Sequence, residues 1–383
     1  MSRIHFQPGL LAAAAALVLL AGCSSAPRHE RPALPVAESF PAAAAAPAAS
    51  APAAAAIAWP AFITDARSQR LVELALQGNR DLRVAVLNVE QARAALGVQR
   101  ADQLPTLGVG ASASRSATGG GASAGSYAAG LQVSAFELDH FGRVKSLTDA
   151  AAARYLATEE GRRAAQLSLV AAVVQADLAL RASEELLALT RRTQATREAS
   201  LALVQRRVDV GAAAEPELRA AESLVAAARA TAAALERQRQ LDTNAIVLLL
   251  GQPLPAGLPA ATPLAEARFA ELPAGLPSEV LLQRPDVRQA EQALVAANAD
   301  IGAARAAFFP RITLTGSLGV ASTELGTLFD SAGAWSLTGQ LLQPLFDAGR
   351  NRANLAASEA RRDIAVAQYE LAVQSAFREV ADA

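Results

Sequence analysis

The chain has little of the chemistry on which most enzymes and metal proteins depend. Its 383 residues include one cysteine, three histidines and one lysine, and aromatic residues make up 4%. A single cysteine excludes an internal disulfide and a multi-cysteine metal site. Two histidines lie near the N-terminus, which leaves His140 for histidine-dependent catalysis. The formal net charge of -1 argues against a nucleic-acid-binding protein, since such proteins usually carry a basic excess.

Alanine is what the chain has in abundance, at about a quarter of its residues, within a hydrophobic fraction of 52%. Alanine is the strongest helix former and adds little side-chain bulk. This composition therefore favours long helices over large compact cores. Length alone would predict two or three domains of ~100–200 residues.

Residues 1–22 have the features of a secretory signal peptide. Arg3 precedes an apolar run over 10–20, which is shorter than the ~20 residues that a membrane-spanning helix needs. The run ends in Leu20-Ala21-Gly22-Cys23, which resembles a bacterial lipobox and implies acylation of Cys23. Ser24 follows, where an aspartate would favour inner-membrane retention, so we expect an outer-membrane destination. A plain signal peptide with a chance cysteine is the alternative.

A tether and two copies of one unit make up the rest of the chain. Residues 23–58 are rich in proline and alanine and predict an extended, lipid-anchored tether. Beyond it, Leu96-Gly97-x-x-Arg100-Ala101 recurs about 205 residues later as Ile301-Gly302-x-x-Arg305-Ala306. Such self-similarity indicates a duplicated architecture. We assign the first repeat to 59–271 and the second to 272–383.

Both repeats predict the same order of elements. Apolar residues at helical spacing, then at alternate positions, then again over long stretches without proline, indicate helix, strand, strand and long helix in turn. The first repeat is predicted to hold helix ~81–103, strands ~106–116 and ~127–138, and helices ~144–207 and ~217–250. The second is predicted to hold helix ~286–308, strands ~311–321 and ~334–344, and helix ~350–383.

The second repeat is shorter than the first. By the repeat offset it should continue ~93 residues beyond Ala383. The expected missing parts are the distal half of the second long helix, its tip and its return helix. We therefore expect a C-terminally incomplete chain, either a gene fragment or a degenerate protein.

The four predicted strands alternate between apolar and small polar residues over about ten residues each, as membrane β-strands do. In the strand ~127–138, Leu131, Val133 and Ala135 are expected to oppose Gln132, Ser134 and Phe136. A soluble β-sandwich is the alternative. Four strands are too few to close a membrane barrel, so the chain must assemble with copies of itself. Two copies supply eight strands and three supply twelve, which is wide enough for a water-filled lumen.

Several strings in the chain resemble the TolC/OprM/NodT group of outer-membrane efflux lipoproteins. They lie in order between about Trp59 and Ala383, and are Phe136-Glu137-Leu138-Asp139-His140-Phe141-Gly142-Arg143, Asn244-Ala245-Ile246, Gly275-Leu276-Pro277-Ser278, Arg284-Pro285-Asp286, Ala297 to Pro310, Ala367-Gln368-Tyr369-Glu370 and Phe377-Arg378-Glu379-Val380. The resemblance implies an α+β membrane protein with a duplicated strand hairpin and long helical hairpin. It also implies a homotrimer with a twelve-stranded β-barrel and an α-helical periplasmic tunnel. The implied partners are outer-membrane lipid, a periplasmic adaptor and an inner-membrane pump of the resistance-nodulation-division type.

Two groups of residues are candidates for function. The first marks the junctions between helices and strands and comprises Pro105, Gly142, Arg143, Pro310, Gly349 and Arg350. The second is the predicted tip of the helical hairpin, which the resemblance places against the adaptor, and comprises Arg207, Val208, Asp209, Gly211 and Pro216. A mere helix reversal is the alternative for the tip.

The chain is predicted to be neither an enzyme nor a metal or cofactor protein. Asp139 and His140 are interpreted as a polar junction rather than an acid–base pair, and the glycines at 119–121 as an extracellular loop. The predicted function is an outer-membrane exit duct for drugs or other small molecules. A duct for a type I-like secretion system and a non-functional fragment are the alternatives. A periplasmic adaptor does not fit, because it would have neither the duplication nor the four membrane-like strands.

Overall fold

The computed structural model describes residues 26–38, 40, 57–117, 123–271, 278–330 and 332–382. Cys23 and the glycines at 119–121 lie outside the described residues. The chain forms two compact units that interleave in sequence: Met1–Glu38, Asn88–Gly161 and Leu281–Ala383 make the first, and Ser39–Leu87 and Arg162–Val280 make the second. Each predicted repeat thus contributes to the first unit, so the compact units do not coincide with the sequence repeats.

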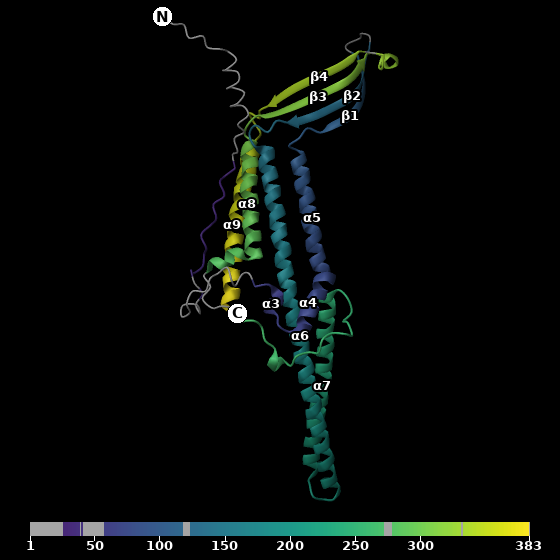
Figure 1. Cartoon of the computed structure of the whole chain (residues 1–383), viewed down its shortest axis with the longest axis vertical. Helices are drawn as coiled ribbons and strands as arrows, with labels where there is room; N and C mark the ends of the chain where they lie inside the picture. Colours follow the sequence, from purple (N-terminus) through teal and green to yellow (C-terminus); the bar gives the residue numbers. More distant parts are fainter. Residues whose placement is uncertain are drawn as a thin grey trace. The chain divides into compact units, whose positions relative to one another are not determined.

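Long helices and one sheet dominate the described residues (Figure 1). The elements, in chain order, are α3 (Trp59–Phe62), α4 (Ala66–Gly78), α5 (Arg80–Ala101), β1 (Leu107–Ser116), β2 (Ala124–Glu137), α6 (Arg143–Asp209), α7 (Glu215–Leu250), α8 (Pro285–Ala306), β3 (Arg311–Ser322), β4 (Gly333–Leu342) and α9 (Arg350–Asp382). Short 3-10 turns lie at Leu264–Glu266, Ser278–Gln283 and Leu325–Thr327. The helix α6 has 67 residues, which corresponds to a rod of about 100 Å at ~1.5 Å per residue.

The sheet of the first unit is antiparallel and follows the order β1-β2-β3-β4. Its central pairing, β2 with β3, joins the first repeat to the second. One cross-strand row runs through Val109, Leu131, Leu318 and Trp335, because each residue is the ladder partner of the next. Paired residues point to the same face of a sheet, so these side chains share one face. All four are exposed, from 42% for Leu131 to 84% for Val109.

Small polar residues lie in the neighbouring row and therefore on the opposite face. That row runs through Gly108, Gln132, Ser317 and Ser336, and the two serine hydroxyls are 2.8 Å apart. One face of the sheet thus carries large apolar side chains and the other carries small polar ones. The outer strands β1 and β4 each have one edge without a partner strand among the described residues.

A β-bulge changes the predicted alternation near the end of β2. Val133 pairs with Gly316, but the next ladder pair is Phe136 with Leu314, so β2 uses one residue more than β3 between them. The extra residue places Phe136 on the same apolar face as Leu131 and Val133. Strict alternation had predicted the opposite face for Phe136. Ala135 has a φ of 48° in the bulge, and its N–H donates to the Thr315 hydroxyl at 3.2 Å.

The second unit has its own apolar core between α4, the middle of α6 and the end of α7. Its largest fully buried side chains are those of Leu71, Leu180, Ile246 and Leu250. Asn79 joins the start of α5 to the end of α7, since its side-chain oxygen accepts the Leu82 N–H and its amide donates to the Leu249 carbonyl. In the first unit, α8 and α9 pack side by side, and Val287, Leu294, Ile301, Tyr369 and Val373 are buried there.

Candidate functional site

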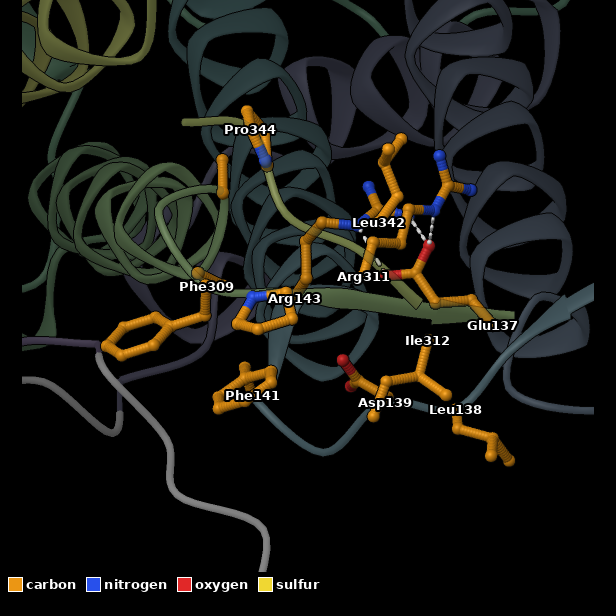
Figure 2. Close-up of a pocket in the computed structure, with 13 residues that line it drawn as sticks. Glu137, Leu138, Asp139, Phe141, Arg143, Phe309, Arg311, Ile312, Leu342 and Pro344 are labelled. Carbon is orange, nitrogen blue, oxygen red and sulfur yellow. Dashed lines mark hydrogen bonds and ion pairs between the residues drawn. The ribbon is translucent and has the colours of Figure 1, made fainter. Parts of the chain in front are cut away.

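The junction between sheet and helices in the first unit is organised around the carboxylate of Glu137, the last residue of β2. Arg143, at the start of α6, donates to both oxygens of Glu137 at 2.7 Å. Arg311, at the start of β3, approaches the same carboxylate at 2.7 Å. Figure 2 shows the carboxylate facing the two guanidinium groups. A bidentate arginine–carboxylate pair is strong and directional, so it fixes how β2, β3 and α6 meet.

Equivalent aspartates start the helix that follows each strand pair. Asp139 accepts the N–H groups of Val144 and Lys145 at 2.9 and 2.6 Å, and thereby caps α6. In the second repeat Asp347 accepts the N–H groups of Gly349 and Asn351 at 3.0 and 2.9 Å and caps α9. The backbone hydrogen bonds to the Asp347 carboxylate hold its pKa below the usual range.

The predicted junction residues all lie at changes of element. Pro105 follows α5, and Pro310 precedes β3. Gly142 and Gly349 have φ angles of 72° and 85°, which side-chain-bearing residues adopt only at a cost, and Arg143 and Arg350 begin α6 and α9 directly afterwards.

A cavity of about 230 Å³ lies at the same junction. Its lining includes Glu137, Asp139, Arg143 and Arg311 together with the rings of Phe141 and Phe309 (Figure 2). The two rings stack at a centroid distance of 4.9 Å. The lining of this cavity thus combines charged groups with stacked aromatic rings.

The side chains of this junction serve structure rather than proton transfer. Both oxygens of Asp139 are occupied by backbone N–H groups of α6. The His140 ring packs edge-on against Phe141 at 5.0 Å. Within the described part of the chain, no group of three His, Cys, Asp or Glu side chains is arranged to hold a metal ion.

The second predicted site, the hairpin tip, lies in the second unit. The chain reverses between Asp209 and Glu215, and Gly211 adopts a φ of 73° there. The Ala212 N–H donates to the Arg207 carbonyl at 2.7 Å, and the Arg207 side chain donates to the Ala212 carbonyl at 3.2 Å. These bonds close the last turn of α6. Pro216 lies in the first turn of α7, where its missing N–H has no cost.

The tip presents charge and one apolar side chain to solvent. Arg207 and Asp209 are exposed, Val208 is half-buried, and Val210 is 77% exposed. The Asp209 carboxylate accepts a hydrogen bond from Gln205 at 2.9 Å.

Two ion-pair clusters, one buried and one partly buried, were not foreseen from the sequence. In the second unit, Arg181 of α6 is 2% exposed and donates to Asp65 at 2.6 Å and to Asp177 at 2.5 Å. Ser68 and Arg67 also donate to Asp177. In the first unit, the two carboxylate oxygens of Glu291 on α8 accept hydrogen bonds from Nε and Nη2 of Arg31 at 2.7 and 3.1 Å. No sequence pattern marks either cluster, because Arg181 and Glu291 stand among other charged residues of their helices.

Comparisons with known proteins agree with this architecture. The family model described as "Outer membrane efflux protein" matches residues 71–252 and 276–383. The outer membrane protein OprJ of Pseudomonas aeruginosa is 48% identical over 373 residues, covering 95% of this chain and 78% of that protein. The solvent efflux pump outer membrane protein SrpC of Pseudomonas putida is 44% identical over 378 residues, covering 96% of this chain and 80% of that protein.

Solved structures show the same fold. The open state of the MtrE outer membrane channel of Neisseria gonorrhoeae superposes with a TM-score of 0.83 at 41% identity, covering 94% of this chain and 81% of that chain. CusC superposes with a TM-score of 0.81 at 37% identity, covering 94% and 82%. The chain therefore belongs to the outer membrane efflux protein family. The predicted family, α+β fold class, outer-membrane localisation and efflux function are confirmed, and the family is one of transport proteins rather than enzymes.

Proposed function

We propose that three copies of this chain form one efflux channel, with a twelve-stranded barrel in the outer membrane and a helical tunnel in the periplasm. The observation that carries the proposal is the sheet with one exposed apolar face and two open edges. An open edge in lipid leaves each backbone group unsatisfied at several kcal/mol, so β1 of one copy must pair with β4 of the next. Three such pairings close a ring with a water-filled interior.

Two adjacent residues of β3 test which face meets lipid. Leu318 lies in the apolar row and Ser317 in the polar row. Leu318→Arg is expected to abolish insertion, since arginine on the lipid face costs about 2–4 kcal/mol near the bilayer midplane. Ser317→Arg is expected to insert normally and to lower the cation conductance in planar bilayers. A purified, folded protein with no conductance at all would refute the channel.

The family to which the chain belongs indicates the class of cargo. We propose that the channel carries drugs or other small organic molecules, and that a periplasmic adaptor connects it to an inner-membrane pump of the resistance-nodulation-division type. Relatives named as solvent and antibiotic efflux pump proteins support this class of cargo.

The exposed tip of the α6–α7 hairpin is the proposed adaptor contact. The charges of Arg207 and Asp209 and the apolar side chain of Val210 are exposed at the end of the hairpin, where they can recognise a specific adaptor surface. A photo-crosslinking residue at Val210 is expected to capture the adaptor, and Arg207→Glu or Asp209→Arg to reduce capture and efflux together. Arg237→Glu, an exposed charge reversal elsewhere on α7, is the matched control. Equal capture by all variants would remove the tip from the docking surface.

Acylation of Cys23 is the remaining proposal on membrane attachment. Leu20-Ala21-Gly22-Cys23 supports it. Mass spectrometry of the mature protein is expected to show a lipid-modified N-terminal cysteine, and Cys23→Ala to leave the precursor uncleaved. A mature chain without added lipid mass would refute it.

A further inference from the structure

The loop between β4 and α9 carries two large apolar side chains that the described part of the chain leaves uncovered. Leu345 is 94% exposed and Phe346 is 90% exposed. The loop itself is held on both sides of them, since the Gln343 amide donates to the Phe308 carbonyl at 3.1 Å and Asp347 caps α9. Adjacent apolar groups exposed on a fixed backbone mark a surface that another molecule covers.

The start of β1 presents a second exposed apolar surface. Leu104 and Leu107, on either side of the Pro105-Thr106 dipeptide, are 69% and 65% exposed. Neighbouring strands of the sheet alternate in direction, so the start of β1 and the end of β4 lie at the same end of the sheet. The two apolar surfaces thus lie on its two opposite edges.

The pairing of β2 with β3 shows how such a loop is covered within the chain. In the loop after β2, the Leu138 N–H donates to the Ile312 carbonyl at 2.9 Å, and an aromatic ring of the loop stacks on Phe309 at 4.9 Å. The repeat offset of 205 residues maps Phe309 onto Leu104 and Ile312 onto Leu107. The exposed leucines at β1 are therefore the counterparts of residues that already contact a loop.

The capping aspartates align the two loops. Asp139 caps α6 and Asp347 caps α9, so the residue before each cap, Leu138 or Phe346, has the same place in its loop. The repeat relation therefore predicts that Phe346 meets the start of a β1 strand at Leu107. Because β1 and β4 are opposite edges of one sheet, that β1 strand belongs to a second copy.

The two contacts differ in chemistry. Within the chain, the Glu137 carboxylate and the Arg311 guanidinium form an ion pair at 2.7 Å. The corresponding positions are Leu345, two residues before the capping aspartate, and Thr106 at the repeat offset, and neither is charged. The contact between copies therefore depends on burial of apolar surface, where the contact inside the chain uses an ion pair.

We propose that Leu345 and Phe346 of one copy pack against Leu104 and Leu107 of the next copy, at the helix end of the β4–β1 pairing. The proposal rests on the trimer proposed above and identifies side chains that hold it together. Each copy has one such loop and one such strand start, so three copies in a ring cover every exposed pair. Strand pairing brings both surfaces together, which favours a second copy over lipid as the occupant.

Disulfide crosslinking in the full-length protein tests the contact. Phe346→Cys combined with Leu107→Cys is expected to give covalent dimers and trimers on denaturing gels after mild oxidation. The two positions lie on opposite edges of one sheet, so a link between them joins two copies. The matched control combines Phe346→Cys with Leu325→Cys, an exposed leucine beyond the far end of β3, and is expected to stay unlinked. The native chain, oxidised in parallel, accounts for links through Cys23.

A second set of variants tests the apolar character of the contact without cysteines. Phe346→Asp is expected to lower the temperature at which the trimer dissociates, and Phe346→Leu to retain most of the native value. Phe329→Asp changes an equally exposed phenylalanine at the far end of the sheet and is expected to leave the dissociation temperature unchanged. Equal decreases for the two aspartate variants would contradict the contact.

Light scattering of the native protein in detergent separates failure of the contact from failure of the trimer. A monomer would refute the proposed trimer, and the contact with it. A trimer in which Phe346→Cys and Leu107→Cys stay unlinked leaves the proposed channel intact and overturns the contact. Quenching of a fluorophore on Phe346→Cys by brominated phospholipid would in that case assign lipid as the occupant.

Discussion

Arg181 and Asp177 face each other one helical turn apart on α6, 2.5 Å between guanidinium nitrogen and carboxylate oxygen, with both side chains almost entirely buried. Asp65 approaches the same guanidinium from the start of α4. The pair therefore ties the segment before α4 to the long helix. Without Arg181, Asp177 keeps Arg67 as its cation, but the largely buried Asp65 carboxylate has none.

We expect Arg181→Met to lower the free energy of unfolding by about 3–5 kcal/mol. Arg191→Met is the matched control, because Arg191 also lies on α6 and pairs with an acid, Glu236, but is 63% exposed. An exposed pair contributes less than about 1 kcal/mol. Denaturant unfolding followed by circular dichroism in detergent measures both, and equal losses would contradict the buried-pair interpretation.

The same cluster predicts how stability responds to acid. Burial by itself would raise the pKa of Asp65, but hydrogen bonds from Arg181, Ser68 and Thr262 outweigh it and hold the pKa well below the usual range. Since the folded-state pKa is lower than the unfolded one of ~3.9, Asp65 stabilises the fold above that value and loses this contribution as the pH falls further.

Thermal melting between pH 3 and pH 7 is therefore expected to show a steeper decline at the acid end for the native protein than for Asp65→Asn. Asp65 also caps α4 through the Ser68 N–H at 2.8 Å. Asp65→Ser keeps a capping oxygen without a titratable group, so its profile should be as flat as that of Asp65→Asn. Parallel acid declines in all three proteins would exclude Asp65 as the source.

The two arginines at the sheet–helix junction are expected to contribute unequally to the stability of the fold. Arg143 makes two hydrogen bonds to Glu137 and is 35% exposed, whereas Arg311 is 56% exposed and makes one close approach. We expect Arg143→Met to cost about 2 kcal/mol and Arg311→Met less than about 1 kcal/mol. The temperature at which the assembled protein dissociates on gels measures the two destabilisations. A larger decrease for Arg311→Met than for Arg143→Met would contradict the expectation.

Two facing glycines set the spacing of the central strands. Gly130 of β2 pairs with Gly319 of β3, and a Cβ on Gly319 would collide with the Ala129 carbonyl and the Gly130 Cα. Gly319→Ala is therefore expected to cost about 1–3 kcal/mol through overpacking. Gly339→Ala on β4 is the control, because a Cβ added there would meet no heavy atom of the described residues within 4 Å. The refolding yield of both variants in detergent micelles measures these effects. A low yield for Gly339→Ala with a normal yield for Gly319→Ala would contradict the prediction.

Most helices and strands could be predicted from the sequence, because their hydrophobic residues recur at a regular spacing over long stretches. The proline-free stretch that predicted helix ~144–207 corresponds to α6, Arg143–Asp209, and the alternation that predicted strand ~311–321 corresponds to β3, Arg311–Ser322. Alternation failed at Ala135, since a bulge depends on the partner strand and leaves no mark in its own residues.

Contacts between distant segments were not accessible. Nothing in the composition of 23–58 distinguishes Ala26 and Arg31 from the surrounding linker, and their partners Gly302 and Glu291 appear in the sequence as ordinary helix positions. Such pairings arise only when the fold brings the segments together. For the same reason, Arg181 was indistinguishable from the many exposed arginines of α6.

The ladder between β2 and β3 also governs the order in which the chain acquires its structure. Each hairpin, β1–β2 and β3–β4, closes over a short loop, but Glu137 meets Thr313 only after the whole of α6, α7 and α8 has been made. Contacts so distant in sequence carry the largest loop-closure entropy and form slowly. We therefore expect the two hairpins to form before the ladder that joins them. Of the three ladders within the sheet, the β2–β3 ladder closes the longest loop, which makes it the step most exposed to delay during biogenesis.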